Sequence, residues 1–358
     1  MKKILWIIIA LLVAMTSFAC GAVPQTIDMF KPWQGTYEKA VYDVSFYYFL
    51  KTDQSNNANL SDKIVKDPLE NNAPKIKFAS GILEYIIEQV DEEKNTWQLT
   101  SNLTVNYLKD EDLSKDILGA EYKDFVSAIN YVGIKNLGVQ DTMNSTVVFS
   151  MQTGKLFRPI SVTKKYSDLS KAESLDKPYI LEYSFDYNTR KYTYNLNGEE
   201  KAKTFKAKEV KSGYDNEELY LFARALDKKT YGKGATLSVS PFYNWTDSIG
   251  SKTAAAYTIN MSIDDEIKTI SVTDAFLPYV QELVNTDNRL PVYDVTLAKA
   301  STYESGPSLK AYYSQYGINA NNSYADKLMI KAVQNIMDVS QVRRTLAVSY
   351  DIASLEIR

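Results

Sequence analysis

The sequence contains no histidine and only one cysteine, Cys20. Without histidine the chain has no Ser-His-Asp or Cys-His nucleophile, no imidazole general base and no histidine-ligated zinc. Once Cys20 is modified or removed, the remaining chain has no thiol for disulfide or thiolate chemistry. The sequence therefore predicts no catalytic residue, no cofactor and no metal site, and it indicates that the protein is not an enzyme.

Long hydrophobic runs are also scarce, and the one that stands out lies at the N-terminus. Lys2 and Lys3 precede an apolar run over 4–15, which is shorter than the roughly 20 residues that a membrane-spanning helix needs. Small residues follow the run directly. A short positive segment, an apolar segment and a small-residue end are typical of a secretory signal peptide. We therefore predict a signal peptide over residues 1–19 and export of the protein.

The end of this run resembles a bacterial lipobox, in which small residues precede a cysteine that becomes acylated. Ala19 and Gly21 fit the pattern around Cys20, Ser17 is tolerated, and Phe18 departs from it. The preferred interpretation is cleavage between Ala19 and Cys20 after acylation of Cys20. An ordinary signal-peptidase site is the alternative, since Ser17 and Ala19 are both small. An uncleaved anchor is disfavoured because the run is short and Pro24 follows it.

Acyl chains on Cys20 would hold the mature protein at a membrane, because a second chain converts marginal binding into stable attachment. Residues 20–35, with Pro24 and Pro32, then form the lipidated N-terminus and a tether. We therefore expect a bacterial cell-envelope protein, at the periplasmic or outer face, that contacts its membrane through N-terminal acyl chains.

The composition is that of a globular protein, with 45% hydrophobic and 24% charged residues and a net charge of −3. A mildly acidic chain does not indicate nucleic-acid binding. The 27 tyrosines favour β structure, because a tyrosine ring packs on a pleated surface while its hydroxyl reaches water.

Most of the chain has strand-like patterns. Alternating aromatic and β-branched residues predict a strand over 37–50, and two further runs around 91–94 predict a hairpin. Residues 110–131 have helical spacing, and 215–226 predict a short helix. About a dozen strands with two or three short helices predict a mainly β fold, an antiparallel sandwich or open (half) barrel. The β-rich parts 36–166 and 167–358 are either two units or one continuous domain.

The second half contains three extended patterns of strand, helix and turn. They are DTMNSTVVFSMQTGKLFRPISVTKKY, the helix YDNEELYLFARAL and PVYDVTLAKASTYESGPSLKAYYS. Together they resemble DUF3108, a family of exported bacterial proteins of unknown function. The likeness covers about residues 140–335. The resemblance implies a periplasmic or surface-exposed β-rich protein and transfers no site residue.

Acidic clusters are the remaining candidates for chemistry. Asp110, Asp112, Ser114 and Glu121 have the spacing of calcium ligands, but Lys115 stands where the loop needs glycine. We therefore expect a helix start there. The acids at 264–266 lie between two strand-like runs and are expected in a solvated turn. A carboxylate-dependent, glycan-active hydrolase is the remote alternative.

Aromatic residues offer a candidate ligand groove, since aromatic walls suit lipids, glycans and peptides. Cross-strand packing is the default explanation for the same residues. The candidate groove residues are Tyr183, Tyr187, Tyr192, Tyr194, Tyr312 and Tyr313.

These observations predict a non-catalytic binding or envelope-maintenance protein whose ligand is a lipid, a glycan or a protein. The alternative is a structural or assembly protein that contacts another envelope protein through its sheet. A deep apolar cavity favours the first function, and a flat exposed apolar patch favours the second. The sequence leaves the oligomeric state open.

The Cys20→Ser variant tests the anchor. We expect loss of the acyl mass and release of the protein from the membrane fraction, because Cys20 is the predicted attachment point. Mass spectrometry and cell fractionation measure both. Unchanged membrane retention contradicts the lipoprotein interpretation.

Overall fold

The computed structural model describes much of the chain from residue 33 onward. The predicted signal peptide, Ala19, Cys20 and the tether as far as residue 32 lie outside the described residues, so the lipoprotein interpretation stays a prediction. The described residues are 33–50, 64–65, 74–152, 155–204, 213–214, 217, 220–221, 224, 237–241, 259–299, 309–340 and 343–358.

The described chain is dominated by β-strands. In the first half the strands are β1 (Tyr37–Phe49), β2 (Ile64–Val65), β3 (Lys75–Asp91), β4 (Thr96–Tyr107), β5 (Gln140–Gln152), β6 (Lys155–Asp168), β7 (Tyr179–Asp186), β8 (Lys191–Leu196) and β9 (Glu199–Thr204). In the second half they are β10 (Gly213–Tyr214), β11 (Leu237–Pro241), β12 (Ile259–Ser271), β13 (Arg289–Lys299), β14 (Leu309–Ser314), β15 (Ile318–Ala320), β16 (Ser323–Ala325), β17 (Met329–Ser340) and β18 (Arg343–Ile357).

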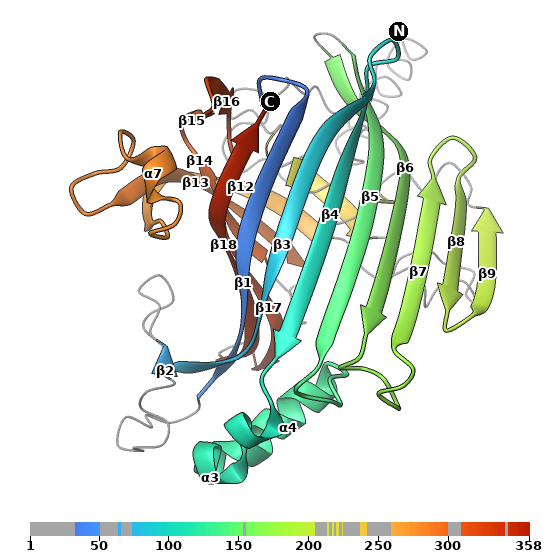
Figure 1. The fold of residues 1–358 in the computed structure, drawn as a ribbon, viewed down its shortest axis with the longest axis vertical. Coiled ribbons are helices and arrows are strands. Elements are labelled where there is room, and N and C mark those ends of the chain that lie inside the picture. Colours follow the sequence, from blue (N-terminus) through green and yellow to red (C-terminus); the bar gives the residue numbers. More distant parts are fainter. Residues whose placement is uncertain are drawn as a thin grey trace, which may run out of the picture.

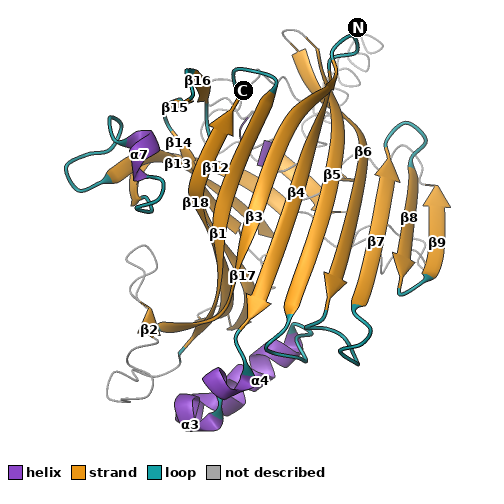
Figure 2. Ribbon diagram, viewed as in Figure 1, coloured by secondary structure: helices purple, strands orange, loops and turns teal. Residues whose placement is uncertain are grey.

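Sixteen of these strands form one sheet, in the order β10-β11-β12-β13-β14-β17-β18-β1-β3-β4-β5-β6-β7-β8-β9, with β2 added to β3. All pairs are antiparallel except the short β10–β11 contact. Among the described residues β9 and β10, at the two ends, do not pair with each other, so the sheet is open (Figure 1). This confirms the predicted mainly β, antiparallel, half-barrel class. Figure 2 shows how little of the described chain is helical.

The first and last strands meet at the middle of the sheet. β1 pairs with β18 on one side and with β3 on the other. β6 pairs with β7 across the predicted boundary near residue 167. Strands from both predicted halves, 36–166 and 167–358, therefore belong to one sheet.

Residues alternate between two faces along β1. Ala40, Tyr42 and Val44 are buried, whereas Asp43 is exposed. We call the face that carries Tyr42 the inner face. Residues directly opposite one another on antiparallel strands share a face, so register extends the inner face through Leu83 and Leu103. The main hydrophobic core lies on this side.

Helical turns cover one end of the sheet (Figure 2). They are η2 (Asp110–Leu113), α3 (Lys115–Leu118), η3 (Gly119–Glu121) and α4 (Tyr122–Tyr131), which confirms the helix predicted over 110–131. Phe125 and Leu118 pack there in a second core with Phe78 of β3. The Tyr48 hydroxyl donates a 2.9 Å hydrogen bond to Glu121. This carboxylate, which has the sequence spacing of a calcium ligand, therefore links the helices to β1. A further short helix, α7 (Leu277–Val280), follows β12.

Two local expectations have different outcomes. The predicted hairpin turn at 91–94 is confirmed, since β3 and β4 flank it. The turn expected at 264–266 is wrong. These residues lie inside β12, where the register with β13 shifts between Ile263 and Ile267. A bulge places extra residues in one strand without ending it, and this irregularity imitates a turn in the sequence.

The last residues of the predicted tether belong to the folded body. Trp33 is buried and its ring makes an edge-to-face contact with Trp97, with centroids 5.6 Å apart. The Gln34 amide donates to the Tyr324 carbonyl. The tether therefore ends before Trp33.

Gly81 of β3 allows close approach of β4. It lies on the inner face between Val44 and Val105, and a Cβ there would lie 2.0 Å from the Thr104 carbonyl oxygen. We predict that Gly81→Ala lowers the free energy of unfolding by about 2 kcal/mol, as overpacking does, measured by urea denaturation. The neighbouring Ile82→Ala, at a half-exposed position, should change it by under about 0.5 kcal/mol. Equal effects contradict this account.

Candidate functional site

Four residues with helical backbone lie against the inner face of the sheet. Their spacing of three, one and three places them on one side of a helix, and all four are buried. We call them the helical face; they are Glu217, Tyr220, Leu221 and Arg224.

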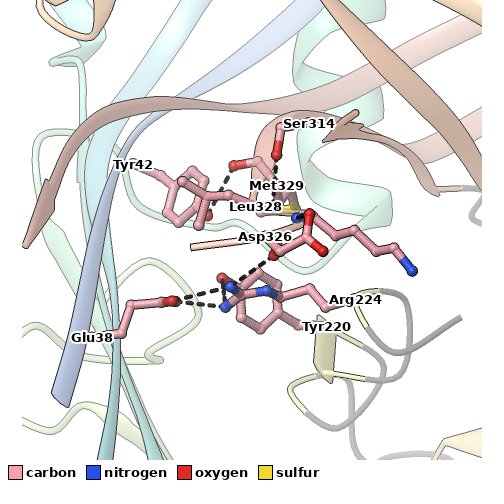
Figure 3. Close-up of polar contacts among 9 residues, drawn as sticks. Glu38, Tyr42, Tyr220, Arg224, Ser314, Asp326, Leu328 and Met329 are labelled. Atoms are coloured by element: carbon pink, nitrogen blue, oxygen red, sulfur yellow. Dashed lines mark hydrogen bonds and ion pairs between the residues drawn. The ribbon is translucent and has the colours of Figure 1, made fainter. Parts of the chain in front are cut away.

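Arg224 pairs with Glu38 of β1 (Figure 3). Both side chains are buried, and the guanidinium Nη1 and Nη2 donate to Glu38 Oε1 and Oε2 at 2.5 and 3.0 Å. Nη2 also donates to the Asp326 carbonyl at 3.1 Å. A bidentate pair of this kind fixes the orientation of both groups. The Glu38 charge raises the pKa of Arg224 against the opposing effect of burial, so the guanidinium stays charged.

Glu217, about two turns away on the helical face, makes the opposite pair. Its carboxylate accepts a hydrogen bond from Lys164 Nζ of β6, and both side chains are buried. The two ends of the helical face thus carry opposite charges, and each charge meets its counterion on a different strand. An uncompensated buried charge is costly, so the pairs define one orientation of the helical face.

The contacts of the helical face show that the sheet curves around it. Glu217 reaches β6, whereas Tyr220 and Arg224 interact electrostatically with Tyr313 of β14. Six strands lie between β6 and β14 in the sheet order. In a flat sheet with strands ~4.8 Å apart they would be about 34 Å apart, far beyond the reach of a helix about 10–12 Å across. The inner face is therefore concave.

Tyrosines fill the space around the two pairs. Tyr220 stacks on Tyr85 of β3, with ring centroids 4.3 Å apart, and Tyr42 donates to the Met329 carbonyl at 3.0 Å (Figure 3). Burial raises the pKa of Tyr220 to about 12. Burial and the nearby Glu217 carboxylate also raise the pKa of Tyr85. These phenols stay protonated at physiological pH, and the Tyr220 hydroxyl accepts a 3.4 Å hydrogen bond from Arg224 Nη1.

The six predicted groove tyrosines all belong to or pack on the main hydrophobic core, and they lie at the two flanks of the sheet. Tyr183 pairs with Tyr194 across β7 and β8, opposite Lys164, so both lie on the inner face. Tyr187 and Tyr192 share that face, because they are an even number of residues from Tyr183 and Tyr194. All four belong to or pack on the main core.

Tyr312 and Tyr313 lie on a different strand, β14. They are adjacent, so they point to opposite faces. Register connects Ala311 to Val44 through Ala332 and Tyr350, so Tyr313, two residues from Ala311, lies on the inner face. Tyr312 is opposite Asp294 and Lys331 and lies on the outer face.

Two carboxylates face each other at the end of β5 and β6. Asp141 and Asp168 are directly opposite in register and are both buried. Asp141 accepts hydrogen bonds from the Ser170 amide, at 2.8 Å, and from its hydroxyl. Asp168 pairs with Lys171 at 2.6 Å. Both acids thus hold the segment that follows β6. No group of three or more potential metal ligands occurs among the described residues.

No protein-family model and no curated protein matches the chain. A solved β-barrel-like protein of the domain of unknown function DUF1849 from Brucella abortus is similar over 91% of this chain and 99% of its own, with 8% identity and a TM-score of 0.44. A candidate lipoprotein from Parabacteroides distasonis covers 92% of this chain and 99% of its own, with 9% identity and a TM-score of 0.24. Both likenesses are too distant to support an argument, and the DUF3108 resemblance stays a prediction. Within the described part of the chain, no helix is both long and apolar enough to cross a membrane.

The Arg224–Glu38 pair holds the helical face against β1, and removing one partner of this pair tests that role. We predict that Glu38→Gln lowers the free energy of unfolding by about 3–5 kcal/mol, because Arg224 then stays buried without a counterion. Lys39→Gln breaks the neighbouring, partly exposed pair with Glu84 and should cost under about 1 kcal/mol. Urea denaturation measures the free energy of unfolding of both variants. A loss under about 1 kcal/mol for Glu38→Gln contradicts the role given to the Arg224–Glu38 pair.

Asp168 gives a pH-dependent prediction. Burial, opposed by Lys171, raises the pKa of this carboxyl, so the folded state binds its proton more tightly than the unfolded state. This group therefore favours folding at low pH, and its contribution is lost as pH rises through the raised pKa. We predict that the difference in thermal-unfolding midpoint between Asp168→Asn and the wild type is more positive at pH 7 than at pH 4. The exposed pair variant Glu173→Gln is the control, and an unchanged pH profile for Asp168→Asn contradicts the assignment.

Proposed function

We propose that this protein is a non-catalytic, membrane-anchored protein of the bacterial cell envelope that binds a lipid on the concave inner face of its sheet. The observation that carries the proposal is the wrapping of one open sheet around the helical face. A concave, mainly apolar surface with a few convergent polar groups is the usual form of a small-molecule site.

The lining of the inner face supports a lipid over a glycan or a peptide. The inner-face residues of β3 to β7 on either side of Tyr85 are chiefly aliphatic and aromatic, with few hydrogen-bonding groups. Acyl chains are bound through buried apolar area, at about 0.8 kcal/mol per methylene. Sugars would need many more polar partners on the wall.

The described outer face gives less support to the assembly alternative. Ile82 and Val90 of β3 are about half exposed, but Glu84 and Glu88 lie between them on the same face, and Asp43 and Thr104 are opposite Ile82. Isolated apolar residues among charges are normal for a protein surface.

Native mass spectrometry of the mature protein, purified from its own envelope, tests the proposal. We expect a bound lipid mass that disappears on denaturation, which separates it from the covalent acyl chains on Cys20. An empty monomer contradicts the proposal. A retained protein subunit in place of the lipid supports the assembly alternative and also contradicts it.

A further inference from the structure

A row of polar residues crosses the inner face beneath the helical face. Register places Tyr85 of β3 opposite Ser101 of β4, Ser101 opposite Ser145 of β5, and Ser145 opposite Lys164 of β6. The row therefore joins the Tyr85–Tyr220 stack to the Lys164–Glu217 pair.

Apolar rows flank this polar row on both sides. Two residues along the strands, the first flanking row consists of Ile87, Leu99, Val147, Val162 and Phe185. In the other direction, the second flanking row consists of Leu83, Leu103, Met143, Tyr166 and Leu181. A polar strip between two apolar strips matches an amphipathic molecule rather than a purely apolar one.

The two serines are unusual within this row. Ser101 and Ser145 are almost fully buried, and their hydroxyls have no hydrogen-bond partner among the residues that the structure describes. A buried hydroxyl without a partner costs stability, and an alanine at either position would avoid that cost. Two neighbouring hydroxyls beside an ammonium group are thus better explained by a ligand than by the stability of the empty protein.

The helical face already presents ligand-like chemistry to this row. Glu217 places a carboxylate on Lys164, and Tyr220 places an apolar ring on Tyr85. The serines belong to β4 and β5, the two strands that lie between β3 and β6 in the sheet order. Within the protein itself, the polar row thus contacts a carboxylate and, next to it, an apolar ring. A ligand with an anionic group on an apolar body would offer the same two features.

We propose that Ser101, Ser145 and Lys164 form the head-group site for an amphipathic anion, a carboxylate or phosphate on an acyl chain, and that Glu217 occupies this site in the ligand-free protein. The head group accepts hydrogen bonds from both serines and replaces Glu217 as the counterion of Lys164. The acyl chain lies along a flanking apolar row. This inference rests on the proposed lipid-binding function and specifies the lipid.

Binding of three matched ligands tests the inference. Oleate, oleyl phosphate and oleyl alcohol share one chain and differ in the head group, and each is titrated against delipidated mature protein by displacement of the neutral probe N-phenyl-1-naphthylamine. We expect oleate or oleyl phosphate to bind at least tenfold more tightly than the alcohol, and their order identifies the head group. Equal binding of all three overturns this inference but leaves lipid binding intact. Absence of binding by all three overturns both.

Two kinds of variant locate the site. Glu217→Gln should bind the preferred anion about tenfold more tightly, because the internal competitor is gone, and bind the alcohol unchanged. Lys165→Gln, at a half-exposed lysine next to Lys164 in the chain, is the control with no expected effect. An unchanged anion affinity in Glu217→Gln contradicts the role given to Glu217.

The serine variants remain informative even if the charge variants fold poorly. Ser101→Ala and Ser145→Ala should each raise the midpoint of thermal unfolding of the empty protein, yet weaken anion binding about tenfold. A purely structural role predicts a lower midpoint in these variants. A lower midpoint with unchanged anion binding overturns the head-group site.

Discussion

The fold depends on two buried ion pairs of the helical face, which supplies the cation to one pair and the anion to the other. Arg224 meets Glu38 on β1, and Glu217 meets Lys164 on β6. Because each pair is desolvated, neither charge can be left alone without a large cost. The helical face therefore links two strands that are separated by β3, β4 and β5, and the open sheet keeps its curvature around it. A closed barrel would fix such curvature by hydrogen bonds alone.

The chain contains no histidine and no cysteine other than Cys20, so the proposed function depends on other polar groups. Most of the buried carboxylates, amines and phenols in the described part of the chain are paired or held protonated by burial. The hydroxyls of Ser101 and Ser145 are among the buried polar atoms that have no hydrogen-bond partner within the described structure.

Much of the fold was predictable from local patterns, whereas the site was not. Alternation along 37–50 and helical spacing over 110–131 reflect which side of each element is buried, and both elements form as expected. The same alternation places Glu38 in phase with Ala40 and Tyr42, so the sequence contained a signal of a buried charge. Its partner Arg224 is 186 residues away, and only the strand order brings the two together. Alternation also places the adjacent Tyr312 and Tyr313 on opposite faces of β14.

The central claim is that Glu217 occupies the head-group site in the ligand-free protein and gives up its pair with Lys164 when an anionic ligand binds. Amide hydrogen exchange of the mature protein with and without bound oleate measures this most directly. The account predicts faster exchange in peptides that contain residues 217–224 and slower exchange in β4 and β5 once oleate is bound. Unchanged or slower exchange around residues 217–224 at saturating oleate would contradict it.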